Sequence, residues 1–419
     1  MKIAALVLTT GKVRPNSNRK SYDSFGFMGL EIVLDIVRNN GNAVDYCTVG
    51  NIKDYDYVLW SITAPEDIST FLGLVGSGCF KKGNAKIIVG GAGCINICSI
   101  YDYIDIAVFG RGETLIIKAL SSVVDNHIWY KSADIKMENE YSIMQALTLD
   151  DREGSCGCNN KCFFCQYTWV RKLTGETYQG PKQGYVGKED DFKNLELNGS
   201  GRYITAWDGL SEATRKRVNK GFVTDALIVE KFSLAISHNH EKAIMLKIFG
   251  IVGYPWETKK QAINDADKIG SLLAPCNEAG NGRLMGAIHL TPFSPEPLTP
   301  MEHCPANITI NWRAFFGGRS YALINEKNIN VFIGPYITTP PTLARRVLIN
   351  RCKLQERAKI QKIIMSGLDG VKGFEIKKKV DDFLGRDVFG WQDDERIVPY
   401  LNSYSDASKI GKKFFNKGE

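Results

Sequence analysis

The stretch Cys156-Gly-Cys158-Asn-Asn-Lys-Cys162-Phe-Phe-Cys165 is the most informative segment of this 419-residue chain. Its last three cysteines, Cys158, Cys162 and Cys165, have the spacing C-x3-C-x2-C. Three thiolates on one short loop can ligate three irons of a cubane [4Fe-4S] cluster and leave the fourth iron open to another ligand. The segment therefore predicts an iron–sulfur site with a vacant coordination position.

Three other roles for these cysteines stay open. A structural zinc site usually pairs two C-x2-C knuckles or adds histidines, but no second knuckle follows and the five histidines show no ligand spacing. A disulfide framework is typical of small secreted domains, whereas this chain is long and begins with a short apolar run that indicates a first β-strand rather than a secretory signal. Ordinary reduced cysteines are the third alternative.

With Phe164 directly before the last cysteine, the motif resembles the cluster loop of the radical S-adenosylmethionine (radical SAM) superfamily. The resemblance implies that Cys158, Cys162 and Cys165 hold a [4Fe-4S] cluster and that Phe164 lies in the cofactor site. It also implies that the open iron binds the amino and carboxylate groups of S-adenosylmethionine (SAM). One electron, from a donor such as flavodoxin or ferredoxin, then cleaves SAM to a 5'-deoxyadenosyl radical.

The composition is that of an ordinary globular protein, with 44% hydrophobic and 24% charged residues. The net charge of +7 permits an anionic partner without demanding one. No apolar run reaches the roughly 18 residues that a membrane span needs. Because eleven cysteines occur without a targeting segment, we expect a cytoplasmic, reducing location.

Residues 1–130 alternate short apolar runs with helical patterns, which predicts a doubly wound parallel sheet of the Rossmann-like kind. A helix is expected over residues 27–40, where apolar residues recur at helical spacing before Gly41. The predicted strands are Ile3–Leu8, Tyr57–Ile62, Lys86–Val89 and Ile104–Phe109.

Glycine-rich turns follow two of these strands, Gly90-Gly-Ala-Gly93 and Gly110-Arg-Gly-Glu113. This half resembles the cobalamin-binding-type domain that precedes the barrel in one branch of radical SAM enzymes. No histidine precedes His127, so the histidine motif that ligates cobalt in some cobalamin proteins is missing. We therefore favour a structural or substrate-gating domain over cobalamin binding. We also expect four cysteines to be small buried hydrophobes rather than ligands of a second cluster: Cys47, Cys79, Cys94 and Cys98.

Residues 140–302 are predicted to form a partial (β/α)6-type radical SAM barrel. The cysteine loop would follow its first strand, Ile143–Leu149, because active sites of βα barrels lie at strand carboxyl ends. Only 42 residues separate Cys165 from Asp208, so the barrel is expected to lack a regular βα unit. The remaining expected strands are Lys193–Leu197, Arg202–Ala206, Ala243–Val252 and Leu284–Leu290.

The segment 207–224 resembles a stretch of the same radical SAM branch that follows a barrel strand. By this resemblance Asp208 and Ser211 face SAM, and Lys220 meets the SAM carboxylate. The residue types agree, because a Ser/Asp pair can cap a helix and a lysine can bind a carboxylate. A solvent-exposed helix terminus is the alternative for Lys220.

The turn Gly253-Tyr-Pro255-Trp-Glu257-Thr258 resembles the G-x-P-G-E-T turn of the branch, which makes Gly253 and Pro255 candidate cofactor contacts. It also matches ordinary helix-start chemistry. The proline-dense segment 291–301 resembles the run that leaves the last barrel strand of the family.

Residues 303–419 are expected to be mainly helical, with a frayed chain end. Basic and aromatic residues around Trp312 leave nucleic-acid contact open. So do basic residues on an expected helix, which more often solvate an exposed face: Arg345, Arg346, Arg351, Lys353, Arg357, Lys359 and Lys362.

The sequence thus predicts a radical SAM enzyme, with no catalytic side chains identified beyond the cluster and the SAM site. Its substrate, small or macromolecular, is not indicated, and methylation or another radical modification would follow hydrogen abstraction. The alternative is a corrinoid-binding or nucleic-acid-binding protein with a structural metal or cluster site and no radical chemistry.

Overall fold

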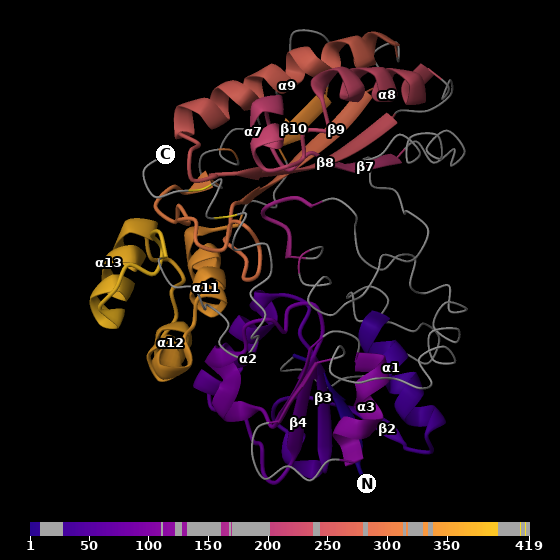
Figure 1. The fold of residues 1–419 in the computed structure, drawn as a ribbon, viewed down its shortest axis with the longest axis vertical. Helices are drawn as coiled ribbons and strands as arrows, with labels where there is room; N and C mark the ends of the chain where they lie inside the picture. The colour runs from indigo at the N-terminus through magenta and orange to yellow at the C-terminus, as the bar shows by residue number, and fades with distance from the viewer. Residues whose placement is uncertain are drawn as a thin grey trace.

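The computed structural model shows two parallel sheets with helices packed around them (Figure 1). The described residues are 1–8, 28–109, 112–121, 128–131, 161–166, 169, 202–237, 244–279, 284–312, 316, 330–333, 338–392, 411 and 415. Several predicted features therefore lie outside the described residues: the strands at 143–149 and 193–197, the Gly110–Arg111 part of one turn, and Cys156 and Cys158.

The first sheet has six parallel strands in the order β2-β1-β3-β4-β5-β6. This order confirms the predicted α/β architecture with a doubly wound parallel sheet. Two of its strands, β2 and β6, were not predicted. The strands are β1 (Ile3–Leu6), β2 (Val44–Cys47), β3 (Tyr57–Ser61), β4 (Lys86–Gly90), β5 (Ile106–Phe109) and β6 (Ile128–Lys131).

Alternate residues of these strands face opposite sides of the sheet, and each side has its own hydrophobic core. On one side Ala5, Leu59 and Ile88 pack with helices α1 (Met28–Asn39) and α3 (Gly112–Ser121). On the other side, residues such as Val58 and Trp60 pack with α2 (Pro65–Gly76).

The second side of the sheet is also covered by helices from the far end of the chain. Between β4 and β5 the chain forms only a 3-10 helix, η3 (Cys98–Tyr103), and α12 packs against it. Gly76 of α2 approaches α12 so closely that a Cβ atom there would lie 2.9 Å from Cβ of Met365. The covering elements are α11 (Pro340–Asn350), η5 (Leu354–Glu356), α12 (Arg357–Met365) and α13 (Gly373–Leu384). Helices α11 and α12 lie against α2, and α13 packs on α11 and α12 (Figure 1).

Polar groups fix this arrangement where apolar packing alone would allow sliding. Nδ2 of Asn96 donates to the carbonyls of Asn350 (2.9 Å) and Cys352 (3.0 Å). Arg346 pairs with Glu296 (2.8 Å) and Glu66 (3.3 Å). Buried residues of the first sheet and of the C-terminal helices belong to one hydrophobic core, and these polar contacts fix how the two parts pack.

Because this core is shared, we expect Leu348→Ala in α11 to weaken the first sheet. Leu348 is fully buried, and such a truncation costs about 2–5 kcal/mol of the free energy of unfolding. Denaturant unfolding gives the size of the loss, and amide hydrogen exchange should speed up in β3 and β4 as well as in α11. Exchange that changes in α11 alone would contradict a common core, and Phe374→Ala on exposed α13 surface is the control.

The second sheet has four parallel strands in the order β10-β9-β8-β7. Helices α8 and α9 lie over one of its faces (Figure 1). Strands β7 to β9 were predicted within a few residues, whereas β10, beyond residue 303, was not. The elements are β7 (Arg202–Ala206), α7 (Glu212–Arg217), α8 (Asp225–Ser237), β8 (Ile244–Val252), α9 (Lys259–Ala279), β9 (Leu284–Pro292) and β10 (Asn330–Ile333).

Cysteines and glycines of the first half have structural roles in the described part. Cys47, Cys94 and Cys98 are buried in the core, as predicted, and Cys79 is half-buried against it. Burial raises the pKa of Cys47 and of Cys98 to about 12, which opposes thiolate formation.

A helix long and apolar enough for a bilayer does not occur in the described ranges.

The glycine turn after β4 is closed by its own chain. Gly91 has a positive φ of 100°, and a Cβ atom there would lie 2.6 Å from the carbonyl oxygen of Ile62. A Cβ atom on Gly93 would lie 2.5 Å from the backbone nitrogen of Ala64. Close approach of the neighbouring loop therefore explains both glycines without a ligand.

Candidate functional site

A short turn that carries Cys162 and Cys165 packs against segments that follow β7 and β9. The N–H of Phe163 donates to the carbonyl of Val218 (3.0 Å), and the N–H of Met301 donates to the carbonyl of Phe163 (3.2 Å). Nδ2 of Asn219 also donates to the carbonyl of Lys161 at 2.7 Å. The turn is therefore clamped between the end of α7 and the end of the proline-rich segment.

Within this turn the two cysteines are held by hydrogen bonds to one carbonyl. The N–H of Cys165 (3.2 Å) and Nε1 of Trp169 (2.8 Å) both donate to the carbonyl of Cys162. Cys162 is buried and Cys165 is half-buried. Cys158 lies outside the described residues, and within them no three His, Cys, Asp or Glu side chains gather as a metal site. Two of the three predicted ligands thus share one closed turn.

Asp208 and Lys220 form an ion pair close to the strand ends. Asp208 follows β7 by two residues and has a φ of 56°, a left-handed conformation that aspartate tolerates better than most residues. The hydroxyl of Tyr254 donates to its carbonyl at 2.5 Å. Both side chains of the pair are largely buried, so the solvent-exposed alternative for Lys220 is wrong. Its ammonium group meets a carboxylate of the protein itself.

A buried arginine that the sequence did not single out fixes the loop around Asp208. The guanidinium group of Arg215 donates to the carbonyls of Val223 (2.6 Å), Gly209 (3.2 Å) and Leu210 (3.3 Å), and it also pairs with Asp225. Its side chain is completely buried. These bonds join the residues before α7 to those before α8.

We expect Arg215→Ala to cost roughly 3–5 kcal/mol of the free energy of unfolding, because three buried carbonyls and Asp225 lose their partner. Arg215→Lys should recover only part of this loss, since one ammonium group cannot reproduce the planar fork. Thermal or denaturant unfolding measures both. Lys216→Ala on the exposed side of α7 is the control, and equal stabilities for Arg215→Ala and this control would contradict the role of Arg215.

The turn after β8 is closed by Glu257. Its carboxylate accepts a hydrogen bond from the N–H of Gly253, and its own N–H donates to the carbonyl of Tyr254 (2.9 Å). Gly253 has a φ of 77°, and a Cβ atom there would lie 2.9 Å from Nε1 of Trp312. The glycine is therefore required by packing against Trp312, while Pro255 is half-buried.

Burial, together with the neighbouring charge of Asp265, raises the pKa of the Glu257 carboxyl group from 4.5 to about 7, although the hydrogen bond from the N–H of Gly253 opposes this rise. The folded protein thus holds a proton that the unfolded chain releases above pH 4.5. This contribution to stability is complete below pH 4.5 and is lost as the pH rises through about 7.

Glu257→Gln should remove this dependence, because a neutral amide keeps the acceptor for Gly253 and never ionises. We expect the variant to match the wild type at pH 4.5 and to exceed it by roughly 3 kcal/mol above pH 7. Urea unfolding at a series of pH values measures the difference. A constant difference between the two proteins over this range would contradict the raised pKa.

Aromatic rings line the other side of the cysteine turn. The rings of Tyr254 and Trp256 are stacked at 5.2 Å, and the ring of Phe164 lies 6.3 Å from Tyr254. The guanidinium group of Arg217 lies 4.2 Å from the centre of the Trp256 ring. Burial raises the pKa of Tyr254 well above its usual value, and nearby carboxylates and the charges of Cys162 and Cys165 raise it further. Because Phe164 lies between Cys162 and Cys165 in the sequence, its ring contact places the cysteine turn beside Tyr254.

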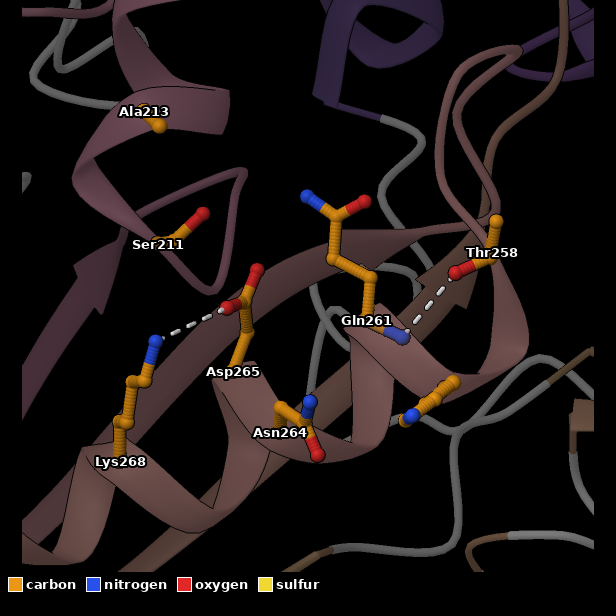
Figure 2. Close-up of a pocket in the computed structure, with 8 residues that line it drawn as sticks. Ser211, Ala213, Thr258, Gln261, Asn264, Asp265 and Lys268 are labelled. Atoms are coloured by element: carbon orange, nitrogen blue, oxygen red, sulfur yellow. Dashed lines mark hydrogen bonds and ion pairs between the residues drawn. The ribbon is translucent and has the colours of Figure 1, made fainter.

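Ser211 faces a neighbouring cavity of about 430 Å³ between α7 and α9 (Figure 2). Its hydroxyl group caps α7 by accepting from the N–H of Thr214 at 3.4 Å. In Figure 2 the side chains of Ser211, Gln261 and Asp265 converge there, and Lys268 approaches Asp265 at 4.0 Å. Asp208 and Lys220 do not line this cavity.

Most of the basic residues considered for nucleic-acid contact have internal partners. Arg345 pairs with Asp369 and Arg357 with Asp102, while Arg351 donates to four backbone carbonyls. Trp312 is buried, so its ring is not a stacking surface. Lys359 and Lys362 are exposed, with their ammonium groups 6.0 and 5.8 Å from the Phe383 ring.

The structure therefore brings together five of the predicted site residues: Cys162, Phe164, Cys165, Asp208 and Lys220. Ser211 faces the adjacent cavity, and Gly253 and Pro255 shape the turn that presents Tyr254. Sequence reasoning missed Tyr254, Trp256 and Arg217. Tyr254 and Trp256 lie inside the Gly253–Thr258 motif, so their aromatic side chains could have indicated a role in the site. The motif was interpreted through its glycine and proline alone.

The described architecture is that of an α/β protein with two parallel sheets, and the site lies where the cysteine turn meets the segments after β7 and β8. No protein-family model matches this chain, and no curated protein sequence is significantly similar to it.

Proposed function

We propose that this chain is a radical SAM enzyme that modifies an unactivated position of its substrate, by methylation or another radical reaction. Strands β7 to β10 would then belong to a partial (β/α)6-type barrel. The supporting observation is the position of Cys162 and Cys165, which share one turn near Tyr254 and the Asp208–Lys220 pair. Parallel βα architectures place their active sites at such strand ends.

The residues present suit a [4Fe-4S] cluster held by Cys158, Cys162 and Cys165. Thiolates are the usual ligands of such clusters, and two of these three cysteines lie in a compact turn. The buried rings of Phe163, Trp169, Tyr254 and Phe293 form a hydrophobic cluster that excludes water. When bound, the cluster would supply the electron that cleaves SAM reductively, with flavodoxin or ferredoxin as the expected donor.

The Asp208–Lys220 pair is suited to orient SAM. One carboxylate and one ammonium group match the ammonium and carboxylate groups of the methionine part of SAM. Tyr254 holds the main chain of Asp208 through its hydroxyl group, and Arg215 holds the next two carbonyls. The protein would thus keep both charged groups in place before the cofactor binds.

For the first sheet we propose a structural or substrate-gating role rather than cobalamin binding. The strand order brings the ends of β1 and β3 together at a topological switch point, where such sheets usually bind ligands. However, the glycines of the turn after β4 are packed against the backbone of Ile62 and Ala64. Protein contacts therefore fill the space beside this loop, which supports a structural or substrate-gating role over cobalamin binding.

Cys162→Ala should abolish both the iron content and the formation of 5'-deoxyadenosine, because the cluster loses one of three ligands. The protein is reconstituted anaerobically with iron and sulfide and then given SAM and dithionite. Iron analysis, visible absorbance and mass spectrometry are the measurements.

Cys276→Ala is the matched control, since Cys276 is also buried but lies in the core between the second sheet and its helices. It should keep both properties. Wild-type protein without iron, or a Cys162→Ala variant with full SAM cleavage, would refute the proposed function.

A further inference from the structure

We infer that Phe415, close to the end of the chain, is a positioning residue for the cysteine turn. The chain end was expected to fray, yet the Phe415 side chain is buried. Its ring packs edge-to-face on Phe163 (5.7 Å between ring centres) and is stacked on Trp256 (5.8 Å). Phe163 is the residue directly after Cys162, so Phe415 acts on the turn through this neighbour.

The contact completes a three-sided restraint on Phe163. Hydrogen bonds to Val218 and from Met301 hold its main chain, but they leave its side chain to be fixed by packing. Phe415 supplies a ring against that side chain, and Trp256 supports Phe415 from the turn after β8. Edge-to-face and offset-stacked rings are favoured arrangements, so the contact has a preferred geometry.

A glycine brings the chain end to this place. A Cβ atom on Gly411 would lie 2.1 Å from the carbonyl oxygen of Pro300, directly before Met301. The N–H of Phe415 then donates to the carbonyl of Gly411 at 2.8 Å, which ties Phe415 to this glycine. Gly411 therefore packs against Pro300, and the next residue, Met301, donates to the carbonyl of Phe163.

Loss of the Phe415 ring would leave a cavity beside Phe163 and loosen the turn, so that Cys162 becomes accessible. This consequence holds whatever group the cysteines bind, whereas the consequence for iron rests on the proposed function. Residues that support metal ligands from outside typically change metal affinity by about 10–100-fold when removed.

The test compares Phe415→Ala with Phe374→Ala, an equivalent change on exposed α13 surface. Metal-free full-length protein is treated with iodoacetamide, and peptide mass spectrometry follows alkylation of Cys162 and Cys165 separately. We expect Cys162 to be alkylated several-fold faster in Phe415→Ala and at the wild-type rate in Phe374→Ala. Phe415→Tyr, which keeps the ring, should restore slow alkylation.

Gly411→Ala is a second variant that keeps the Phe415 ring but should displace it, because the added Cβ atom would clash with the carbonyl of Pro300. It should therefore behave like Phe415→Ala. Circular dichroism confirms that each variant is folded, and iron retention against a chelator is measured after reconstitution. Wild-type rates for Cys162 in both folded variants would overturn the inference. Faster alkylation in a protein that never binds iron would uphold the inference and refute the proposed function instead.

Discussion

The main chain of Phe163 is hydrogen-bonded on both sides, and this clamp determines where the cysteine turn lies. One bond reaches the end of α7 and the other reaches the segment after β9. Strands β7 and β9 both pair with β8, so their relative positions are fixed by the sheet. The clamp thus transfers the geometry of a rigid sheet to the two thiols.

The segment that clamps Phe163 is itself tied to the rest of the molecule. Its Glu296 accepts from Arg346, which also pairs with Glu66 of α2. Asn350 donates to the carbonyl of Pro295, and the carbonyl of Asn350 accepts from Asn96, which lies between β4 and η3. Hydrogen bonds therefore connect the cysteine turn to the first sheet through the C-terminal helices, although these parts are far apart in the sequence.

The sequence was sufficient where the local pattern matched the buried environment. Strand β8 is a nearly continuous apolar run. Asp208 and Lys220 were singled out by the resemblance of segment 207–224 to a known motif; the structure pairs them with each other, and their role at a cofactor stays a prediction. In contrast, β2 reads Val44-Asp-Tyr-Cys47 at a sheet edge, and such a short mixed run has little strand signal.

Other features depend on contacts between distant residues, which leave no local pattern. Arg215 belongs to a basic run that normally indicates solvent exposure, but it is bound by the carbonyls of Gly209 and Leu210 before α7 and of Val223 before α8. Phe415 lies within a charged chain end, and its ring is buried by contacts with the distant residues Phe163 and Trp256. The position of Cys158 lies outside the described residues and stays a prediction.

The common core of β1 to β5 and α11 to α13 also has a consequence for biosynthesis. About 230 residues separate Phe109 from Pro340, so at ordinary translation rates one apolar face of the nascent sheet stays uncovered for on the order of tens of seconds. Such a face can bind chaperones or other nascent chains in that interval. Folding of this protein should therefore depend on the ribosome completing α13 before the exposed strands find another partner.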